Sequence, residues 1–427
     1  MKPAGPERRK VWRAARAPHA GKSKALAELE RRRDELTALC ADLIRIPTEN
    51  PPGDTTKLAA FIERYLRERG IDATIHEPRP GLASLVATLG RGRPNLVLPA
   101  HLDEFPAGSG WTFPPFDGIV RKGRVMGRGA GDMRAGIAVA LMATSLVRES
   151  GIQPRGQLTL AFAADEETGG TWGTQWLLRH VRAVRGDACL IGESSGTWSA
   201  GVGEKGVLWV RIKAEGLSGH SAYALGDSAL RKVQAVIDAA MRLDRAPRPL
   251  RGEVAVLVQA QRAAAEKHWG PGTGVLGDRV TVNVGTLRAG GQVNLIPAAA
   301  EAELDFRLPP GLSTASILRV LERAAARTRG VRIEVINRCE SYVTSPRERL
   351  VRLIVDNARE AAGVRVLPVL RLGYTDGRFF RREGIPTVVY GPRVHRMGGP
   401  DEYIEENELI QVARVHVSAV FDYLGLD

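Results

Sequence analysis

Apolar strands that end in histidine or an acid are the feature that most restricts the fold of this 427-residue chain. The segments NLVLPAHLD, QLTLAFAADEE and ACLIGES each carry such a side chain at the end of a buried-type strand, and helical segments separate them. Strands that alternate with helices predict a layered α/β domain. Because ligands in such domains collect beyond the carboxyl ends of the strands, the three ends predict one shared site.

The remaining periodicities predict how the chain is divided. Expected helices cover residues 25–46, 58–69, 135–150, 347–362 and 407–424, and an expected strand covers 385–390. Between residues 206 and 337 the order β-α-β-β-α-β predicts a small ferredoxin-like α+β unit. We therefore expect a catalytic domain in two parts, 25–205 and 338–427, with 206–337 inserted as a lid. Residues 244–279 receive no assignment.

Composition excludes several classes of function. Residues 1–34 hold eleven Lys/Arg against four Asp/Glu, so they supply +7 of the net charge of +13, and residues 1–24 are expected to be a disordered basic tail. We expect no nucleic-acid partner, because no basic stripe with interleaved aromatics follows. No run of 18 apolar residues predicts a membrane span. Three widely spaced cysteines predict neither a disulfide framework nor a cysteine metal site, which favours a cytoplasmic location.

Two motifs place a candidate metal ligand after a strand or turn. In HLDEFPAG, His101 and Asp103 lie two residues apart on an extended segment and face the same side, so one could bind a metal while the other orients it. In GRGAGDM, Asp132 precedes a helix, where it is either a helix cap or a metal-bridging carboxylate. Taken alone, a loop histidine beside an aspartate is more often structural.

Two further motifs place carboxylates at strand ends. DEETGG closes the apolar strand LTLAFAA, and adjacent side chains on a strand diverge. One of Glu166 and Glu167 can therefore hold a metal while the other faces water as a general base. GESSG closes another apolar strand with Glu193.

The ordered set HxD, GRGxxDM, DEExGG and GESxG resembles the co-catalytic dinuclear zinc aminoacylase and carboxypeptidase family, which includes acetylornithine deacetylase and succinyl-diaminopimelate desuccinylase. The resemblance covers about residues 25–427. It implies two divalent ions, zinc with cobalt or manganese as alternatives. It further implies that Asp132 bridges the ions, that Glu166 is the general base and that Asp103 orients a ligand. The implied terminal ligands are His101, Glu167 and Glu193.

The inserted unit carries motifs of the same family. LSGHSAY (217–223) resembles its lid histidine motif, which implies that His220 stabilises an oxyanion and, in dimeric relatives, enters the partner's site. The resemblance implies that Asn294 contacts the substrate and that Arg307 grips its carboxylate; the alternative for Arg307 is a strand-edge ion pair. The loop GYTDGRFF (373–380) resembles the family's glycine-rich loop near the substrate, which implies that Thr375 and Asp376 lie there.

One position departs from the family pattern. Relatives carry a metal-binding histidine two residues before a PDE-type motif, and here that position is Gly398. We expect His395 to replace it, because two glycines let the loop fold back. The sequence thus predicts a homodimeric hydrolase of an amide bond in an N-acyl amino acid. A dipeptidase or carboxypeptidase, and a non-catalytic amino-acid-binding descendant, are the alternatives.

Overall fold

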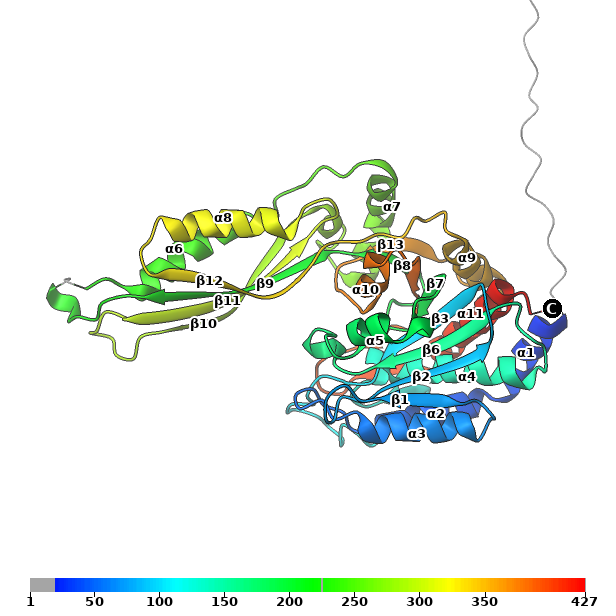
Figure 1. Ribbon diagram of the computed structural model, residues 1–427. Coiled ribbons are helices and arrows are strands. Elements are labelled where there is room, and N and C mark those ends of the chain that lie inside the picture. The colour runs from blue at the N-terminus through cyan, green and yellow to red at the C-terminus, as the bar shows by residue number, and fades with distance from the viewer. Residues whose placement is uncertain (1–19, 224–225, 427) are drawn as a thin grey trace, which may run out of the picture.

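The computed structural model describes residues 20–223 and 226–426, which form an α/β domain and a narrow lid that projects from it (Figure 1). The domain contains an eight-stranded sheet with the order β1-β2-β6-β3-β7-β14-β8-β13. Its strands are β1 (Ala73–His76), β2 (Ser84–Gly90), β3 (Asn95–His101), β6 (Gln157–Ala163), β7 (Ala188–Ile191), β8 (Ser199–Glu204), β13 (Leu367–Arg371) and β14 (Thr387–Val389). The predicted layered α/β domain is confirmed.

The register of the central strands brings the predicted strand ends together. β3 runs parallel to both β6 and β7, with His101 opposite Ala163 and Val97 opposite Cys189. The HLD, DEE and GES segments therefore leave the sheet at the same edge. A small four-stranded sheet lies beside this edge, and its members are β4 (Ile119–Arg121), β5 (Arg124–Met126), β15 (Val394–His395) and β16 (Tyr403–Glu405).

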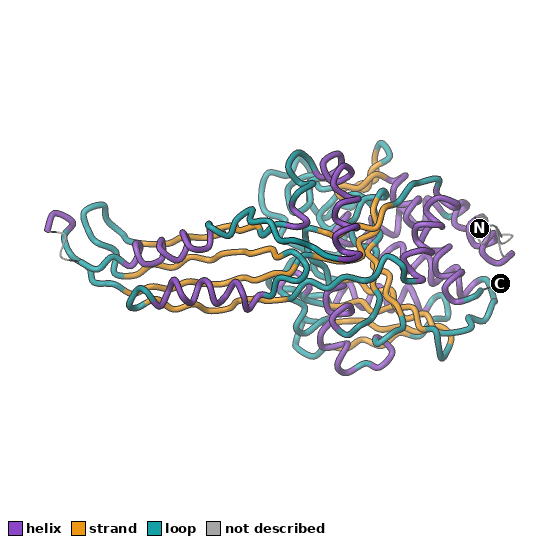
Figure 2. Tube along the Cα trace, turned by 90° about the horizontal axis from the view of Figure 1, so that it is seen from above, coloured by secondary structure: helices purple, strands orange, loops and turns teal. Residues whose placement is uncertain are grey.

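Helices lie on both sides of the large sheet (Figure 2). They are α1 (Ala20–Arg31), α2 (Arg33–Ile44), α3 (Thr56–Arg67), α4 (Ala135–Glu149), α5 (Thr174–His180), α9 (Arg349–Ala362), α10 (Gly377–Arg382) and α11 (Glu406–Leu424). Residues 130–149, which include α4, are long and apolar enough to cross a membrane, but 94% of that stretch is buried within the protein. α4 packs against α2 and α11, so it is a core helix.

The N-terminal helix differs from the sequence prediction. The helix expected at 25–46 is two helices interrupted at Arg32, whose guanidinium binds Glu35 and Glu149. α1 begins at Ala20, so residues 20–24 are helical and not part of a tail. Lys22 anchors this first turn, since its Nζ donates to Asp422 Oδ2 at 2.7 Å. Residues 1–19 of the expected tail lie outside the described residues.

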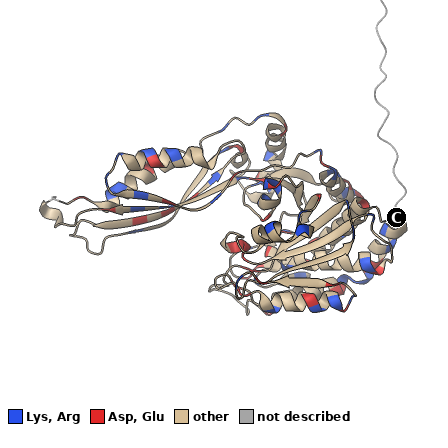
Figure 3. Cartoon of the chain, viewed as in Figure 1, with Lys and Arg blue, Asp and Glu red and all other residues tan. Residues whose placement is uncertain are grey.

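The lid is a four-stranded antiparallel sheet covered on one face by two helices (Figure 1). Its elements are β9 (Gly206–Glu215), α6 (Ala229–Met241), β10 (Thr281–Ala289), β11 (Ala299–Leu308), α8 (Thr314–Ala326) and β12 (Val331–Cys339). The strand order β10-β11-β9-β12 confirms the predicted ferredoxin-like unit. Basic and acidic residues are interspersed on the lid rather than gathered by sign (Figure 3).

A helix that the sequence left unassigned joins the lid to the main domain. α7 (Gly252–Trp269) belongs to the lid segment in the chain but packs against β13, an edge strand of the large sheet. The side chain of Gln261 bonds both the N–H and the carbonyl of Leu370. α7 therefore covers a strand edge that would otherwise present unpaired backbone groups.

Candidate metal centre

His101 is held in the orientation that a metal ligand requires. Its Nδ1 lies 2.9 Å from the Asp103 backbone carbonyl and 3.5 Å from the Asp103 carboxylate, and both residues are fully buried. An Nδ1–H that donates to this carbonyl leaves the Nε2 lone pair for another partner. Nε2 faces Asp132 Oδ1 at 3.0 Å. The expectation that Asp103 orients His101 therefore agrees with this geometry.

The Asp103 carboxylate also fixes the two glutamates of the DEE motif. It accepts the backbone N–H of Glu166 at 3.0 Å and that of Glu167 at 3.1 Å. The side-chain amide of Asn50 donates to the same carboxylate at 2.8 Å, a contact that the sequence analysis missed. β6 ends at Ala163, so the glutamates lie in a short helical turn, Glu166–Thr168, and not on the strand as expected. Their side chains still diverge.

Three donors come together beyond β3 and β6. His101, Asp132 and Glu167 each offer a ligand atom, and these atoms lie within 4.8 Å of one another. Asp132 reaches the group from the turn Ala130–Arg134 before α4, and it forms no cap bond to that helix. This three-donor group combines an imidazole with two carboxylates, the donor types that suit zinc, cobalt or manganese.

The electrostatics of the three-donor group fit a divalent cation. Glu167 Oε1 is buried and has no hydrogen-bond partner among the described residues. Burial, together with the nearby Asp132 and Glu166 carboxylates, raises the pKa of Glu167 to about 11. Burial opposes a charged His101, but hydrogen bonds to Asp103 and Asp132 raise its pKa well above the usual value. A divalent cation would neutralise these crowded carboxylates, so the residues present fit one ion.

Glu166 occupies a different position from Glu167. Its Oε1 accepts from the Arg378 guanidinium at 3.0 Å, and both side chains are buried. Burial raises the pKa of Glu166, whereas the Arg378 charge lowers it. Glu166 therefore lies beside the three-donor group and is not part of it. This is the position that a general base requires. Arg378, from the GYTDGRFF loop, was not predicted.

Glu193 closes the strand β7 but is not a member of the three-donor group. Its Oε1 lies 3.2 Å from the Arg371 guanidinium, and Arg371 also donates to the Ser194 carbonyl at 2.5 Å. Burial raises the pKa of Glu193 well above its usual value, an effect that Arg371 opposes. Arg371 was not predicted, although it closes strand β13 in the same way that the acids close β6 and β7.

The structure does not bring His395 into the three-donor group. Its ring stacks on Tyr403 with centroids 4.4 Å apart and the planes within 2° of parallel. Val394 packs toward Gly131, where an added Cβ would lie 2.3 Å from Val394 Cβ. Successive strand residues point to opposite faces, so His395 points away from the turn that carries Asp132. The prediction that His395 replaces the donor missing at Gly398 finds no support in this placement.

The predicted lid residues, His220, Asn294 and Arg307, are not members of the three-donor group of their own chain. His220 and Asn294 are exposed at adjoining loops, where the Ser221 N–H donates to the Asn294 carbonyl. Arg307 lies near the base of the lid, with its Nε 3.0 Å from Asp305 and its guanidinium 5.0 Å from the Tyr374 ring. The Arg378 guanidinium lies over the same Tyr374 ring, 4.1 Å from its centroid. The ion pair expected as the alternative for Arg307 is therefore present.

The GYTDGRFF loop contacts the centre through Arg378, whose guanidinium donates to Glu166. Thr375 and Asp376, both expected near the substrate, are buried; Thr375 binds Glu204 and Asp376 accepts from Thr174 at 2.5 Å. Burial, with the nearby Glu166, raises the pKa of Asp376 to about 8.

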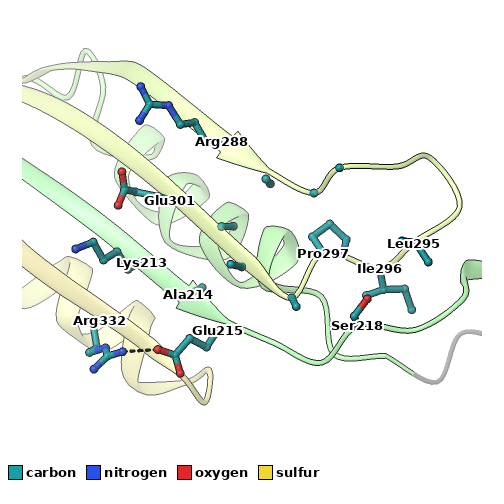
Figure 4. Close-up of a pocket in the computed structure, with 16 residues that line it drawn as sticks. Lys213, Ala214, Glu215, Ser218, Arg288, Leu295, Ile296, Pro297, Glu301 and Arg332 are labelled. Carbon is teal, nitrogen blue, oxygen red and sulfur yellow. Dashed lines mark hydrogen bonds and ion pairs between the residues drawn. The ribbon is translucent and has the colours of Figure 1, made fainter.

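A hollow of about 680 Å³ lies on the lid and not at the metal centre. Lys213, Arg288, Glu301 and the loop before β11 line it (Figure 4). An ion pair between Arg332 and Glu215 closes one side. None of the residues of the three-donor group lines this hollow.

A family model, a sequence relative and solved structures each match most of this chain. Residues 97–422 match the model of peptidase family M20/M25/M40. A succinyl-diaminopimelate desuccinylase from Cereibacter sphaeroides is 31% identical over 406 residues, covering 91% of this chain and 98% of that protein. The M20 metallo-carboxypeptidase Sso-CP2 of Sulfolobus solfataricus superposes with a TM-score of 0.78 at 19% identity, covering 92% of this chain and 100% of its own. The Bacillus subtilis YXEP protein, described as a dinuclear metal-binding M20 peptidase, gives 0.62 at 16% identity, with coverages of 93% and 99%.

Proposed function

The chain belongs to peptidase family M20/M25/M40, and we propose that, as a metal-dependent amide hydrolase of that family, it removes the acyl group from N-acyl amino acids. The observation that carries the proposal is the geometry around Asp103. Its carboxylate holds the backbone of Glu166 and Glu167, so that Glu167 faces His101 and Asp132 while Glu166 lies beside them. A ligand group with an adjacent carboxylate that is not itself a ligand is the arrangement that amide hydrolysis requires.

The roles of the residues follow from their positions. A divalent ion held by His101, Asp132 and Glu167 would supply Lewis acidity and lower the pKa of water at the site. Glu166 takes a proton from the water that attacks the amide carbon and then gives it to the leaving amine. Arg378 keeps Glu166 in place through its ion pair. We further propose zinc as the ion, with cobalt and manganese as alternatives.

The substrate class is supported by one relative and one residue. The Cereibacter sphaeroides relative is a succinyl-diaminopimelate desuccinylase. Arg307 carries a fork-shaped guanidinium that suits the carboxylate of such a substrate, and it lies beside Tyr374, next to Arg378. A carboxypeptidase or dipeptidase activity is the second candidate, favoured by the structural likeness to Sso-CP2.

We also propose that the protein is a homodimer and that it works in the cytoplasm. His220 and Asn294 support the dimer, because both are exposed, in the loops after β9 and β10, and neither belongs to the three-donor group of its own chain. The three cysteines are free, which supports a reducing compartment.

The direct test is a hydrolysis screen with zinc-loaded protein. N-acetyl amino acids, N-succinyl amino acids and dipeptides are compared by kcat/KM. The proposal expects the N-acyl amino acids to be cleaved best. Preferred cleavage of dipeptides would favour the second candidate, and no cleavage of any amide would leave only the non-catalytic binding descendant.

A further inference from the structure

The buried carboxylates of the centre differ in the cation that each one faces. Glu193 pairs with Arg371 at 3.2 Å, and Glu166 pairs with Arg378 at 3.0 Å. Among the described residues, no arginine or lysine forms an ion pair with Asp132 or Glu167. Buried charges require partners, and two carboxylates without an arginine are balanced by one divalent ion. A second ion at Glu193 would have to displace Arg371.

The position of Arg371 is built into the fold. The residue ends β13, whose neighbour in the sheet is β8, and its side chain passes over Gly201 of that strand. A Cβ at Gly201 would lie 2.6 Å from Arg371 Cδ, so the glycine makes room for the arginine stem. The guanidinium is then fixed between the Ser194 carbonyl and Glu193. Arg371 is only 11% exposed, so this charge is a permanent part of the centre.

Among the described residues of the C-terminal segment, the positions nearest in sequence to the missing histidine offer no free donor for a second ion. Gly398 has no side chain, and His395 points away from the Asp132 turn. The nearest acid of that segment, Glu402, is buried and already paired: Oε2 lies 2.6 Å from Arg128, and Oε1 accepts the Gly131 N–H at 3.2 Å. A two-ion centre therefore faces two obstacles. It lacks a terminal ligand from this segment, and Glu193 is already paired with Arg371.

We propose that each chain holds one tightly bound divalent ion, at His101, Asp132 and Glu167, and that the Arg371 guanidinium takes the place of a second ion beside Glu193. Arg371 is a positioning residue: it neutralises Glu193 and fixes the carboxylate next to the centre. This inference rests on the proposed metal-dependent function and departs from the pair of ions expected from the sequence.

The first test counts ions. Metal-free protein is equilibrated with excess zinc, freed of unbound metal by gel filtration, and analysed by inductively coupled plasma and native mass spectrometry. One zinc per chain is expected. Two zinc ions that survive gel filtration would overturn this inference while leaving the proposed function intact. No retained zinc would overturn the proposed function itself.

The second test asks whether Arg371 is the reason that no second ion binds beside Glu193. Gly398→His restores a histidine at this position; an added Cβ would meet only Phe105, at 3.9 Å, but the φ of 70° favours glycine, so the fold of each variant is checked by circular dichroism. Gly398→His alone should still hold one zinc, because Arg371 still occupies Glu193. Adding Arg371→Met should raise the count to two, whereas the surface control Arg359→Met in the same background should not. A folded double variant that keeps one zinc would overturn the role of Arg371.

A third measurement needs no variant. Protein loaded with excess Co²⁺ and freed of unbound metal should give the electron paramagnetic resonance signal of isolated ions. A spin-coupled cobalt pair in wild-type protein would overturn the inference.

Discussion

At the scale of the residue, Glu166 and Glu167 are neighbours with different tasks. Glu166→Gln removes the base but leaves His101, Asp132 and Glu167 in place, so we expect kcat to fall by about 10²–10⁴-fold with an unchanged zinc content. Steady-state kinetics and metal analysis on the same sample provide the check. Exposed Glu360→Gln is the matched control. Near-normal turnover of Glu166→Gln would show that the base lies elsewhere.

Arg307 is tested by its discrimination between substrates. Arg307→Ala should raise the barrier for substrates with a free carboxylate by about 1.5–3 kcal/mol, because a charge-assisted hydrogen bond is lost. The loss is measured as kcat/KM for an N-acyl amino acid and for its carboxamide. An equal loss on both would mean that the ion pair with Asp305 is the only task of Arg307.

The residues that could be predicted are those whose side chains close apolar strands. His101, Glu166, Glu167 and Glu193 were found in this way, since an idle charge is rare there. Arg371 closes β13 by the same rule, but a basic side chain at a strand end does not by itself indicate a metal ligand. The direction of the His395 side chain could not be predicted from the sequence. Its direction depends on which face of a two-residue strand it takes, and packing against Gly131 decides this.

At the scale of the element, α11 is coupled to β14 through a buried histidine. His416 Nε2 donates to the Tyr390 carbonyl at 2.7 Å, and its Nδ1 is buried without a partner. Burial lowers the pKa of His416 to about 4, although the hydrogen bond to Tyr390 opposes this. The folded state therefore holds the imidazole neutral at pH values where the unfolded chain protonates it.

This coupling predicts a loss of stability on acidification. The unfolded imidazole titrates near 6.5, so it binds more protons than the folded one between pH 6.5 and 4. The contribution of His416 is thus present above pH 6.5 and falls by about 2 kcal/mol between pH 7 and 5. Denaturant unfolding of wild type and His416→Gln at both pH values measures it. The variant should lose about 2 kcal/mol less than wild type over this interval; equal losses would contradict the account.

The elements that escaped prediction are those without a one-sided apolar pattern. α6 and α8 bury one face against the lid sheet, and they are the two helices of the predicted order β-α-β-β-α-β. α7 spreads its apolar residues around the helix, leaves Val256 exposed, and owes its stability to contacts with β13 that are distant in sequence. The break at Arg32 likewise depends on Glu149, more than one hundred residues away.

At the scale of the whole molecule, the lid carries His220 away from its own centre, and the proposed dimer would bring it to the partner's. Mixing inactive Glu166→Ala with inactive His220→Ala subunits should then restore up to about a quarter of wild-type activity, because half of the dimers are mixed and each holds one complete site. Subunit exchange followed by an activity assay tests this. Activity from a strictly monomeric protein would exclude a role for His220 across a dimer.

The central claim is that hydrolysis depends on an ion held by His101, Asp132 and Glu167. The most direct measurement is the amide hydrolysis rate of chelator-treated protein during a titration with zinc. The account predicts that the metal-free protein is inactive and that the rate rises in proportion to bound zinc until the site is full. A metal-free protein that hydrolyses the amide at the wild-type rate would contradict the account.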